Sequence, residues 1–188
     1  ALKEGSLSLD DKFLVSEKAW RKGGSKMYVS VNSRVNVEDL LKGVIVQSGN
    51  DASIVIAEGL ASSEAAFALE LNELAKTLSM TNSSFVNASG WPDPDHYTTA
   101  RDLSKLAIAT INNFPDYYHY YAQKSFTYSG IKQFNRNPTL YRKLGADGLK
   151  TGRTQTAGFG LTVSAIRKDR RLVLVLNGFP SSKARANE

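Results

Sequence analysis

Apolar residues recur at helical spacing through the first two thirds of the chain. Four stretches carry this pattern and predict helices: residues 37–46, 51–60, 63–78 and 99–111. In the third stretch, four large apolar residues define one predicted buried face: Phe67, Leu71, Leu74 and Leu78. Thr98 or Thr99 can cap the fourth helix. Residues 87–95, which contain one glycine and two prolines, predict a loop before it.

From residue 125 onward the pattern changes to that of β-strands. Residues 125–128 and 132–134 flank the turn-forming pair Ser129-Gly130 and predict a hairpin. Three further strands are predicted over residues 148–154, 159–166 and 172–176. The charged residues 167–171 lie between the last two strands, and we interpret them as a solvated turn.

Helices followed by antiparallel strands predict a single α+β domain over residues 1–188. Its helical lobe would span about residues 38–120, and its sheet lobe would span residues 121–188. Both ends look interrupted. Residues 1–5 resemble the last turn of a helix closed by a C-cap glycine, and residues 181–188 resemble the start of another helix. We therefore expect further chain on both sides of this sequence.

Composition narrows the classes of protein. With 41% hydrophobic and 22% charged residues, the 188-residue chain can bury a core and is not of the disordered type. It has no cysteine, which excludes disulfides, a thiolate nucleophile and cysteine metal sites. Two histidines give no metal-ligand spacing, so His96 is interpreted as a loop residue and neither a metal nor a cofactor is predicted. The net charge of +6 is spread along the chain, and no zinc-finger or RNA-binding signature supports a nucleic-acid partner.

Two short polar motifs carry the candidate chemistry. Ser48-Gly49-Asn50 follows a predicted helix, and its glycine lets the backbone turn so that both polar side chains can face one cleft. Lys150-Thr151-Gly152 lies on a predicted strand, where an ammonium and a hydroxyl group can bind a substrate carboxylate. The glycine there lets a substrate backbone approach. Each triplet alone is a weak signal, but their order, separation and context favour an acyl-transfer site.

Together the two triplets resemble S-x-N and K-T-G, two of the three motifs of the penicillin-recognising serine peptidases. Further blocks extend the likeness over nearly the whole chain. They resemble the low-molecular-mass D-alanyl-D-alanine carboxypeptidases, also called penicillin-binding proteins. The matching blocks are residues 41–52, 99–103, 126–133, 135–137 and 147–152.

This resemblance implies a β-lactamase/transpeptidase-like fold, with an antiparallel sheet flanked by helices and a helical lobe. It also implies a serine-type hydrolase that cleaves the terminal D-Ala–D-Ala bond of peptidoglycan stem peptides through an acyl-enzyme and that binds β-lactam antibiotics. Such a protein would act on the cell wall, in the periplasmic or extracytoplasmic part of the bacterial cell envelope. Peripheral membrane association through a region after Glu188 is a further expectation.

The resemblance also implies roles for single residues. Ser48 would relay a proton toward the leaving group, and Asn50 would hydrogen-bond the substrate amide. The triplet Lys150, Thr151 and Gly152 would bind the terminal carboxylate and the adjoining substrate backbone.

Two arginines are implied as well. Arg136 would be a second anchor for the terminal carboxylate. The backbone N–H of Arg153 would supply half of the oxyanion hole. Many relatives carry histidine at the position of Arg153, so the resemblance assigns no role to its side chain.

The third motif of the family, S-x-x-K, carries the nucleophilic serine and its lysine base. Only residues 129–132 have this spacing, and we reject them because they follow the Ser48 motif and because a hairpin turn does not place serine and lysine on one helical face. The resemblance places the true motif just upstream of Ala1. Residues 1–188 alone are therefore expected to be inactive.

Two alternatives stay open. A class A β-lactamase relative would carry S-D-N and a deacylating glutamate, and Gly49 counts against it. A non-catalytic peptidoglycan-binding module would keep the carboxylate pocket without a nucleophile.

Overall fold

Helices dominate the first 122 residues of the structure, a computed structural model that describes residues 1–187. The side chains of Ser16, Asn36, Ser63 and Thr99 cap α1, α2, α4 and α5, each by accepting a backbone N–H three residues later. The four predicted helices are confirmed, and the first of them ends in a π-helical turn. The helical segments are α1 Glu17–Arg21, α2 Val37–Lys42, the π-helix η1 Gly43–Gln47, α3 Asn50–Ala61, α4 Glu64–Thr77, α5 Ala100–Asn113, α6 Pro115–Tyr118, the 3-10 helices η2 His119–Ala122 and η3 Pro138–Tyr141, and α7 Ser182–Asn187.

The predicted buried face of α4 is only partly correct. Leu74 is 51% exposed, whereas Ala68 and Ala75 are buried. Alanines contribute little to a hydrophobic pattern, so the prediction of the buried face did not include them. Leu74 instead lines an apolar cavity of about 370 Å³ between the helices.

The described strands pair in antiparallel fashion. At the tip of the β3–β4 hairpin, Ser129 and Gly130 have φ angles of 47° and 77°, as a type I′ turn requires. Ser129 and Lys132 therefore belong to a hairpin, which confirms that they are not a helical S-x-x-K motif. The strands are β1 Lys12–Leu14 with β2 Arg34–Asn36, β3 Ser125–Tyr128 with β4 Ile131–Phe134, and a sheet of β5 Ala146–Thr154, β6 Gly158–Arg167 and β7 Arg170–Phe179 in that order.

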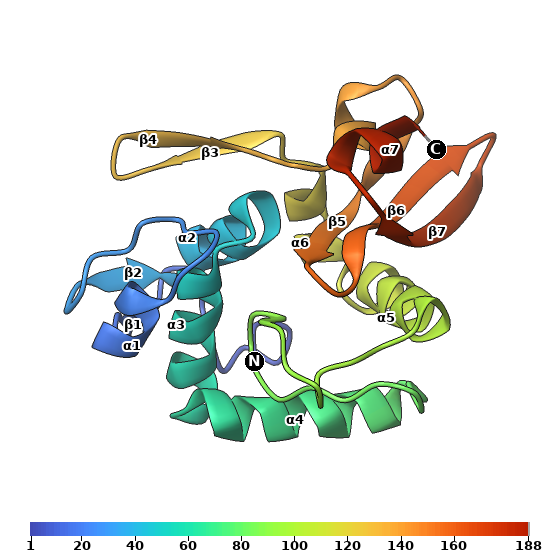
Figure 1. Cartoon of the computed structure of the whole chain (residues 1–188). Helices are drawn as coiled ribbons and strands as arrows, with labels where there is room; N and C mark the ends of the chain where they lie inside the picture. Colours follow the sequence, from blue (N-terminus) through green and yellow to red (C-terminus); the bar gives the residue numbers. More distant parts are fainter. Residues whose placement is uncertain (188) are drawn as a thin grey trace.

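Helices cover both faces of the three-stranded sheet. α5 contacts β6 and β7 from one side, and α7 contacts them from the other, beside the C-terminus (Figure 1). The main apolar core lies apart from this sheet, around Met27, Leu40 and Ile54. The β3–β4 hairpin extends from the sheet above α2 (Figure 1), and its Gln133 donates to the carbonyl oxygen of Met27 at 3.1 Å. This arrangement is the predicted α+β class; the boundary near residue 120 stays a prediction.

Both chain ends show local helix-end geometry. Gly5 has a φ of 74°, its N–H donates to Leu2 O, and the N–H of Ser6 donates to Ala1 O, which is the hydrogen-bond pattern of a helix C-cap. At the other end, Ser181 Oγ accepts the N–H of Ala184 at 3.0 Å and begins α7.

Within residues 1–187, no helix is by itself long and apolar enough to cross a membrane. α3 and α4 reach that length only as a pair, with an 83° bend between them.

The carboxylate of Asp51 fastens the segment before β2 to the start of α3. It is 1% exposed and accepts the backbone N–H groups of Met27, Tyr28 and Val29 at 2.9, 3.0 and 3.3 Å. It also accepts the N–H of Ala52 at 2.9 Å. No cation pairs with it in the described part of the chain, so these N–H groups and the positive end of α3 compensate its charge.

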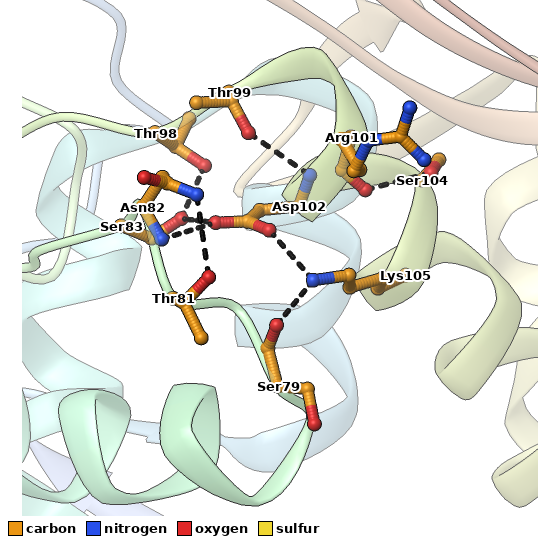
Figure 2. A network of polar contacts seen from close by, with 10 residues as sticks. All are labelled: Ser79, Thr81, Asn82, Ser83, Thr98, Thr99, Arg101, Asp102, Ser104 and Lys105. Atoms are coloured by element: carbon orange, nitrogen blue, oxygen red, sulfur yellow. Dashed lines mark hydrogen bonds and ion pairs between the residues drawn. The ribbon is translucent and has the colours of Figure 1, made fainter.

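The carboxylate of Asp102 acts in the same way at the start of α5 (Figure 2). It accepts the N–H of Asn82 at 2.8 Å and the hydroxyl of Ser83 at 2.9 Å. Lys105 pairs with it at 3.0 Å and also donates to Ser79 O. Burial raises the pKa of Asp102, but the bonds from Asn82, Lys105 and Ser83 outweigh burial and hold the pKa below its usual range. The loop between α4 and α5 is thereby fixed to α5.

We expect Asp51→Asn to lower the free energy of unfolding by about 2–4 kcal/mol, because an amide NH2 would face backbone N–H donors. Urea denaturation measures this. Glu70→Gln removes the same charge from the exposed surface of α4 and should change stability by less than about 0.5 kcal/mol. Equal effects of the two substitutions would contradict the anchoring role of Asp51.

Candidate active site

Ser48 and Lys150 are in contact although 102 residues separate them. Lys150 Nζ donates to Ser48 Oγ at 2.9 Å and to the carbonyl oxygen of Thr151 at 2.9 Å. Ser48 follows η1 in a left-handed conformation with a φ of 60°. π-Helical turns and left-handed non-glycine residues are both energetically costly and concentrate at functional sites. The two predicted motifs are therefore brought together where the backbone is unusual.

Because Gly49 has no side chain, the carboxylate of Asp51 can occupy the space beside it. A carbon in the Cβ position of Gly49 would lie 2.9 Å from Asp51 Oδ1 and 3.2 Å from the backbone nitrogen of Met27. An aspartate at position 49, as in S-D-N, would not fit without moving that carboxylate. This geometry counts against the class A β-lactamase alternative.

Asn50 holds the loop between α1 and β2. Its Nδ2 donates to Gly23 O at 2.8 Å, and its backbone N–H donates to Ser25 O at 2.8 Å. Ser25 Oγ in turn accepts from Arg136 Nη1 at 2.6 Å. Residues 23–25 therefore join two predicted site residues, Asn50 and Arg136, along one rim of the site.

The opposite rim is β5, which pairs with β6 on one side only among the described strands. Because side chains alternate along a strand, Lys150 and Gly152 share one face of β5 and Thr151 lies on the other. A carbon in the Cβ position of Gly152 would meet no atom within 4 Å, so open space lies beside Lys150. The Thr151 side chain is buried, and its carbonyl oxygen is the atom that contacts Lys150.

Arg185, from α7, adds a third cation to Lys150 and Arg136. It is 7% exposed and donates to Gly160 O and Arg136 O, both at 3.4 Å. No carboxylate in residues 1–187 forms an ion pair with Arg136, Lys150 or Arg185. The site thus concentrates positive charge without a counter-ion of its own.

Burial, with smaller contributions from the neighbouring guanidinium groups of Arg136 and Arg185, lowers the pKa of Lys150 to about 8. Lys150 also borders a mostly apolar cavity of about 290 Å³ that includes Leu103 and Leu149 in its lining. An anion bound among Lys150, Arg136 and Arg185 would be attracted by all three cations, and its charge would raise the pKa of Lys150 again.

Arg153 lies at the exposed end of β5, and its guanidinium is 5.1 Å from the ring centroid of Phe159. The side chain therefore contacts its cross-strand neighbour on β6. The role implied for its backbone N–H stays a prediction.

The sequence did not indicate three residues of this site: Gly23, Ser25 and Arg185. The pair Gly23-Gly24 is a turn signal, but nothing local relates it to Ser48. Ser25 and Arg136 are 111 residues apart, and Arg185 lies in a segment that the sequence marks only as a helix start. Only the folded chain brings these residues together.

The fold and the two motifs are those of the penicillin-recognising serine peptidases. A family model described as D-alanyl-D-alanine carboxypeptidase matches residues 1–180. The chain belongs to this family.

Curated relatives match the chain over its whole length. It is 40% identical over 195 residues to D-alanyl-D-alanine carboxypeptidase DacC of Escherichia coli, covering 100% of this chain and 49% of the relative. It is 37% identical over 193 residues to DacA of Haemophilus influenzae, covering 100% of this chain and 49% of that protein. The chain thus spans about half the length of these relatives.

Solved structures give the same result. Penicillin binding protein 5 from Haemophilus influenzae superposes with a TM-score of 0.96 at 37% identity, over 100% of this chain and 56% of that one. D-alanyl-D-alanine carboxypeptidase DacD from Francisella tularensis superposes with a TM-score of 0.94 at 33% identity, over 99% of this chain and 58% of that one. The predicted β-lactamase/transpeptidase-like fold is confirmed.

Gly152 and Gly160 face each other across β5 and β6, and they should respond differently to alanine. Gly160→Ala would place Cβ against Asn177 Oδ1 and 3.2 Å from Leu176 O, so we expect a loss of about 1–3 kcal/mol in the free energy of unfolding. Gly152→Ala meets open space and should leave stability unchanged within about 1 kcal/mol. Urea denaturation of both variants checks this. A comparable loss in Gly152→Ala would show that the space beside Lys150 is not open.

Proposed function

We propose that this chain forms the substrate-binding wall of a serine-type D-alanyl-D-alanine carboxypeptidase that acts on peptidoglycan stem peptides and is acylated by β-lactams. Membership of the family supports the type of reaction. The hydrogen bond between Lys150 Nζ and Ser48 Oγ is the observation that carries the proposal; it lies beside two arginines that pair with no carboxylate of residues 1–187. This arrangement favours the binding of an anion, and it places the hydroxyl of Ser48 next to the position where that anion would bind.

The substrate's terminal carboxylate binds between Lys150 and Arg136 and takes the place of the missing counter-ion. Asn50 Oδ1 accepts the substrate amide N–H while Nδ2 stays on Gly23 O. The substrate backbone lies along the free edge of β5, where Gly152 leaves space and the backbone N–H of Arg153 faces the scissile carbonyl.

Ser48 relays the proton that the leaving D-alanine nitrogen requires. Its Oγ already accepts a hydrogen bond from Lys150 Nζ. Because the pKa of Lys150 lies at about 8, a proton can move between this ammonium and its neighbours near neutral pH at little free-energy cost.

The reaction also needs a nucleophilic serine with a lysine base. Within residues 1–187 the S-x-x-K spacing occurs only in the β3–β4 turn, so the proposed mechanism takes these two residues from a helix outside residues 1–188. Because the proposed substrate is peptidoglycan, the proposal includes action in the bacterial cell envelope, on the extracytoplasmic side. It also includes peripheral membrane association through a region after Glu188.

Binding can be measured without turnover. We expect an N-acetylated peptide that ends in D-Ala-D-Ala to bind residues 1–188 at least about tenfold more tightly than its C-terminal amide, because only the free carboxylate pairs with the cations. Below pH 8 Lys150 is an ammonium, so affinity should be highest there. It should fall as the pH rises through about 8 and this proton is lost. Calorimetric titration at several pH values measures both effects.

Arg136→Ala should weaken binding by about tenfold and move the fall in affinity to higher pH, since Arg136 is one cause of the low pKa of Lys150. Arg34→Ala removes the same charge from an exposed position of β2 and serves as the matched control. Equal binding of the free acid and the amide would rule out a carboxylate site.

Acylation tests the nucleophile. We expect no covalent labelling of residues 1–188 by a fluorescent penicillin, and stoichiometric labelling of a longer form of the protein that includes a helical Ser-x-x-Lys. Gel fluorescence and intact mass report the adduct. Labelling of residues 1–188 would show that a serine within them is the nucleophile. Peptide binding without labelling of the longer form would identify a non-catalytic peptidoglycan-binding module instead.

A further inference from the structure

Trp91 lies beside Asn50 although it belongs to the loop between α4 and α5. A carbon in the Cβ position of Gly24 would lie 2.6 Å from Asn50 Nδ2 and 3.2 Å from Trp91 Cζ3. The same construction on Gly23 would lie 3.7 Å from Trp91 Cη2. The indole therefore rests on the two glycines next to Asn50, while Trp91 itself stays 42% exposed.

Lys22 places a positive charge on this aromatic ring. Its Nζ lies 4.2 Å from the ring centroid of Trp91, within the range of a cation–π contact. The nearby carboxylate of Glu64 is already bound by Lys18 at 2.7 Å and by the N–H of Ala88 at 3.1 Å. Lys22 forms no ion pair among residues 1–187, so its ammonium remains available to an anion.

The loop that carries Trp91 is fixed at its tip and at its base. At the tip, Asn87 Oδ1 accepts the backbone N–H of Trp91 at 3.0 Å, and Asn87 Nδ2 donates to Trp91 O at 2.9 Å. At the base, Asp102 binds Asn82 and Ser83 (Figure 2). The position of the indole is thus set before any ligand arrives, which lowers the entropic cost of binding.

Residues 22–25 connect this pair to the cations of the proposed carboxylate site. Lys22 lies on Trp91, Gly23 O accepts from Asn50, and Ser25 Oγ accepts from Arg136. A peptide whose C-terminal carboxylate is bound by Arg136 and Lys150, and which passes Asn50, therefore has its preceding residues directed toward Trp91 and Lys22.

We propose that Trp91 and Lys22 form a side-chain subsite that selects peptides in which the residue before the two terminal D-alanines carries an aliphatic side chain ending in an anionic group. This inference rests on the proposed function. The methylene groups pack against the indole, and the anion pairs with the Lys22 ammonium. The Lys22 ammonium beside the exposed part of the indole favours an acidic side chain over a neutral sugar.

Three N-acetylated tripeptides that end in D-Ala-D-Ala and begin with glutamate, glutamine or lysine test the subsite by titration into residues 1–188. Glutamate should bind about three- to fivefold more tightly than glutamine, and lysine should bind more weakly than both, as expected of one partly exposed ion pair. The preference should shrink in 1 M salt.

Lys22→Met keeps an unbranched side chain and should abolish the preference of glutamate over glutamine without weakening glutamine binding. Trp91→Ala should weaken all three peptides, and Trp91→Phe should restore part of the loss. Lys76→Met removes the same charge from the exposed side of α4, where Lys76 pairs with Glu73, and should leave the preference intact.

Equal affinity for the glutamate and glutamine peptides, with the free acid still preferred over the C-terminal amide, would overturn the subsite and leave the proposed function standing. A preference that survives in Lys22→Met would overturn it as well. Failure of every peptide to distinguish acid from amide would overturn the proposed function, and the subsite with it.

Discussion

The buried carboxylate of Asp51 is the constraint on which the candidate site depends. It fixes the backbone of residues 27–29 at the start of α3 and fills the space beside Gly49. Residues 23–25 directly precede that fixed segment, so they lie where Asn50 can bind them. Arg136 then binds Ser25. The position of one rim of the site therefore depends on a single buried carboxylate.

Asp102 fixes a second loop in the same way. Both aspartates lie in the first turn of a helix, where the positive end of the helix dipole favours a negative charge, and both bind backbone N–H groups about twenty residues away in sequence. The segment held by Asp51 is continuous with residues 23–25, and the loop held by Asp102 carries Trp91 to the same place. Two helix starts therefore position two loops next to Asn50.

Local signals in the sequence were sufficient for the helices, the β3–β4 hairpin and the two motifs, because caps, turn residues and periodicity are local properties. They were insufficient for Ser25 and Arg185, whose partners lie 111 and 49 residues away. They also overvalued Leu74, because a helix face can be buried by alanines while a leucine lines a cavity. The contact of Ser48 with Lys150 followed from a family resemblance, since no periodicity relates positions 102 residues apart.

The electrostatics of the site explain why its cations are arranged around Lys150. Burial of Lys150, together with the nearby charges of Arg136 and Arg185, disfavours its ammonium form and lowers its pKa to about 8. A carboxylate side chain at this place would offset this effect, but it would also occupy the position that an anionic ligand needs. Because no carboxylate within residues 1–187 pairs with Lys150, its ammonium stays open to an anionic ligand while it holds the hydroxyl of Ser48 by a hydrogen bond.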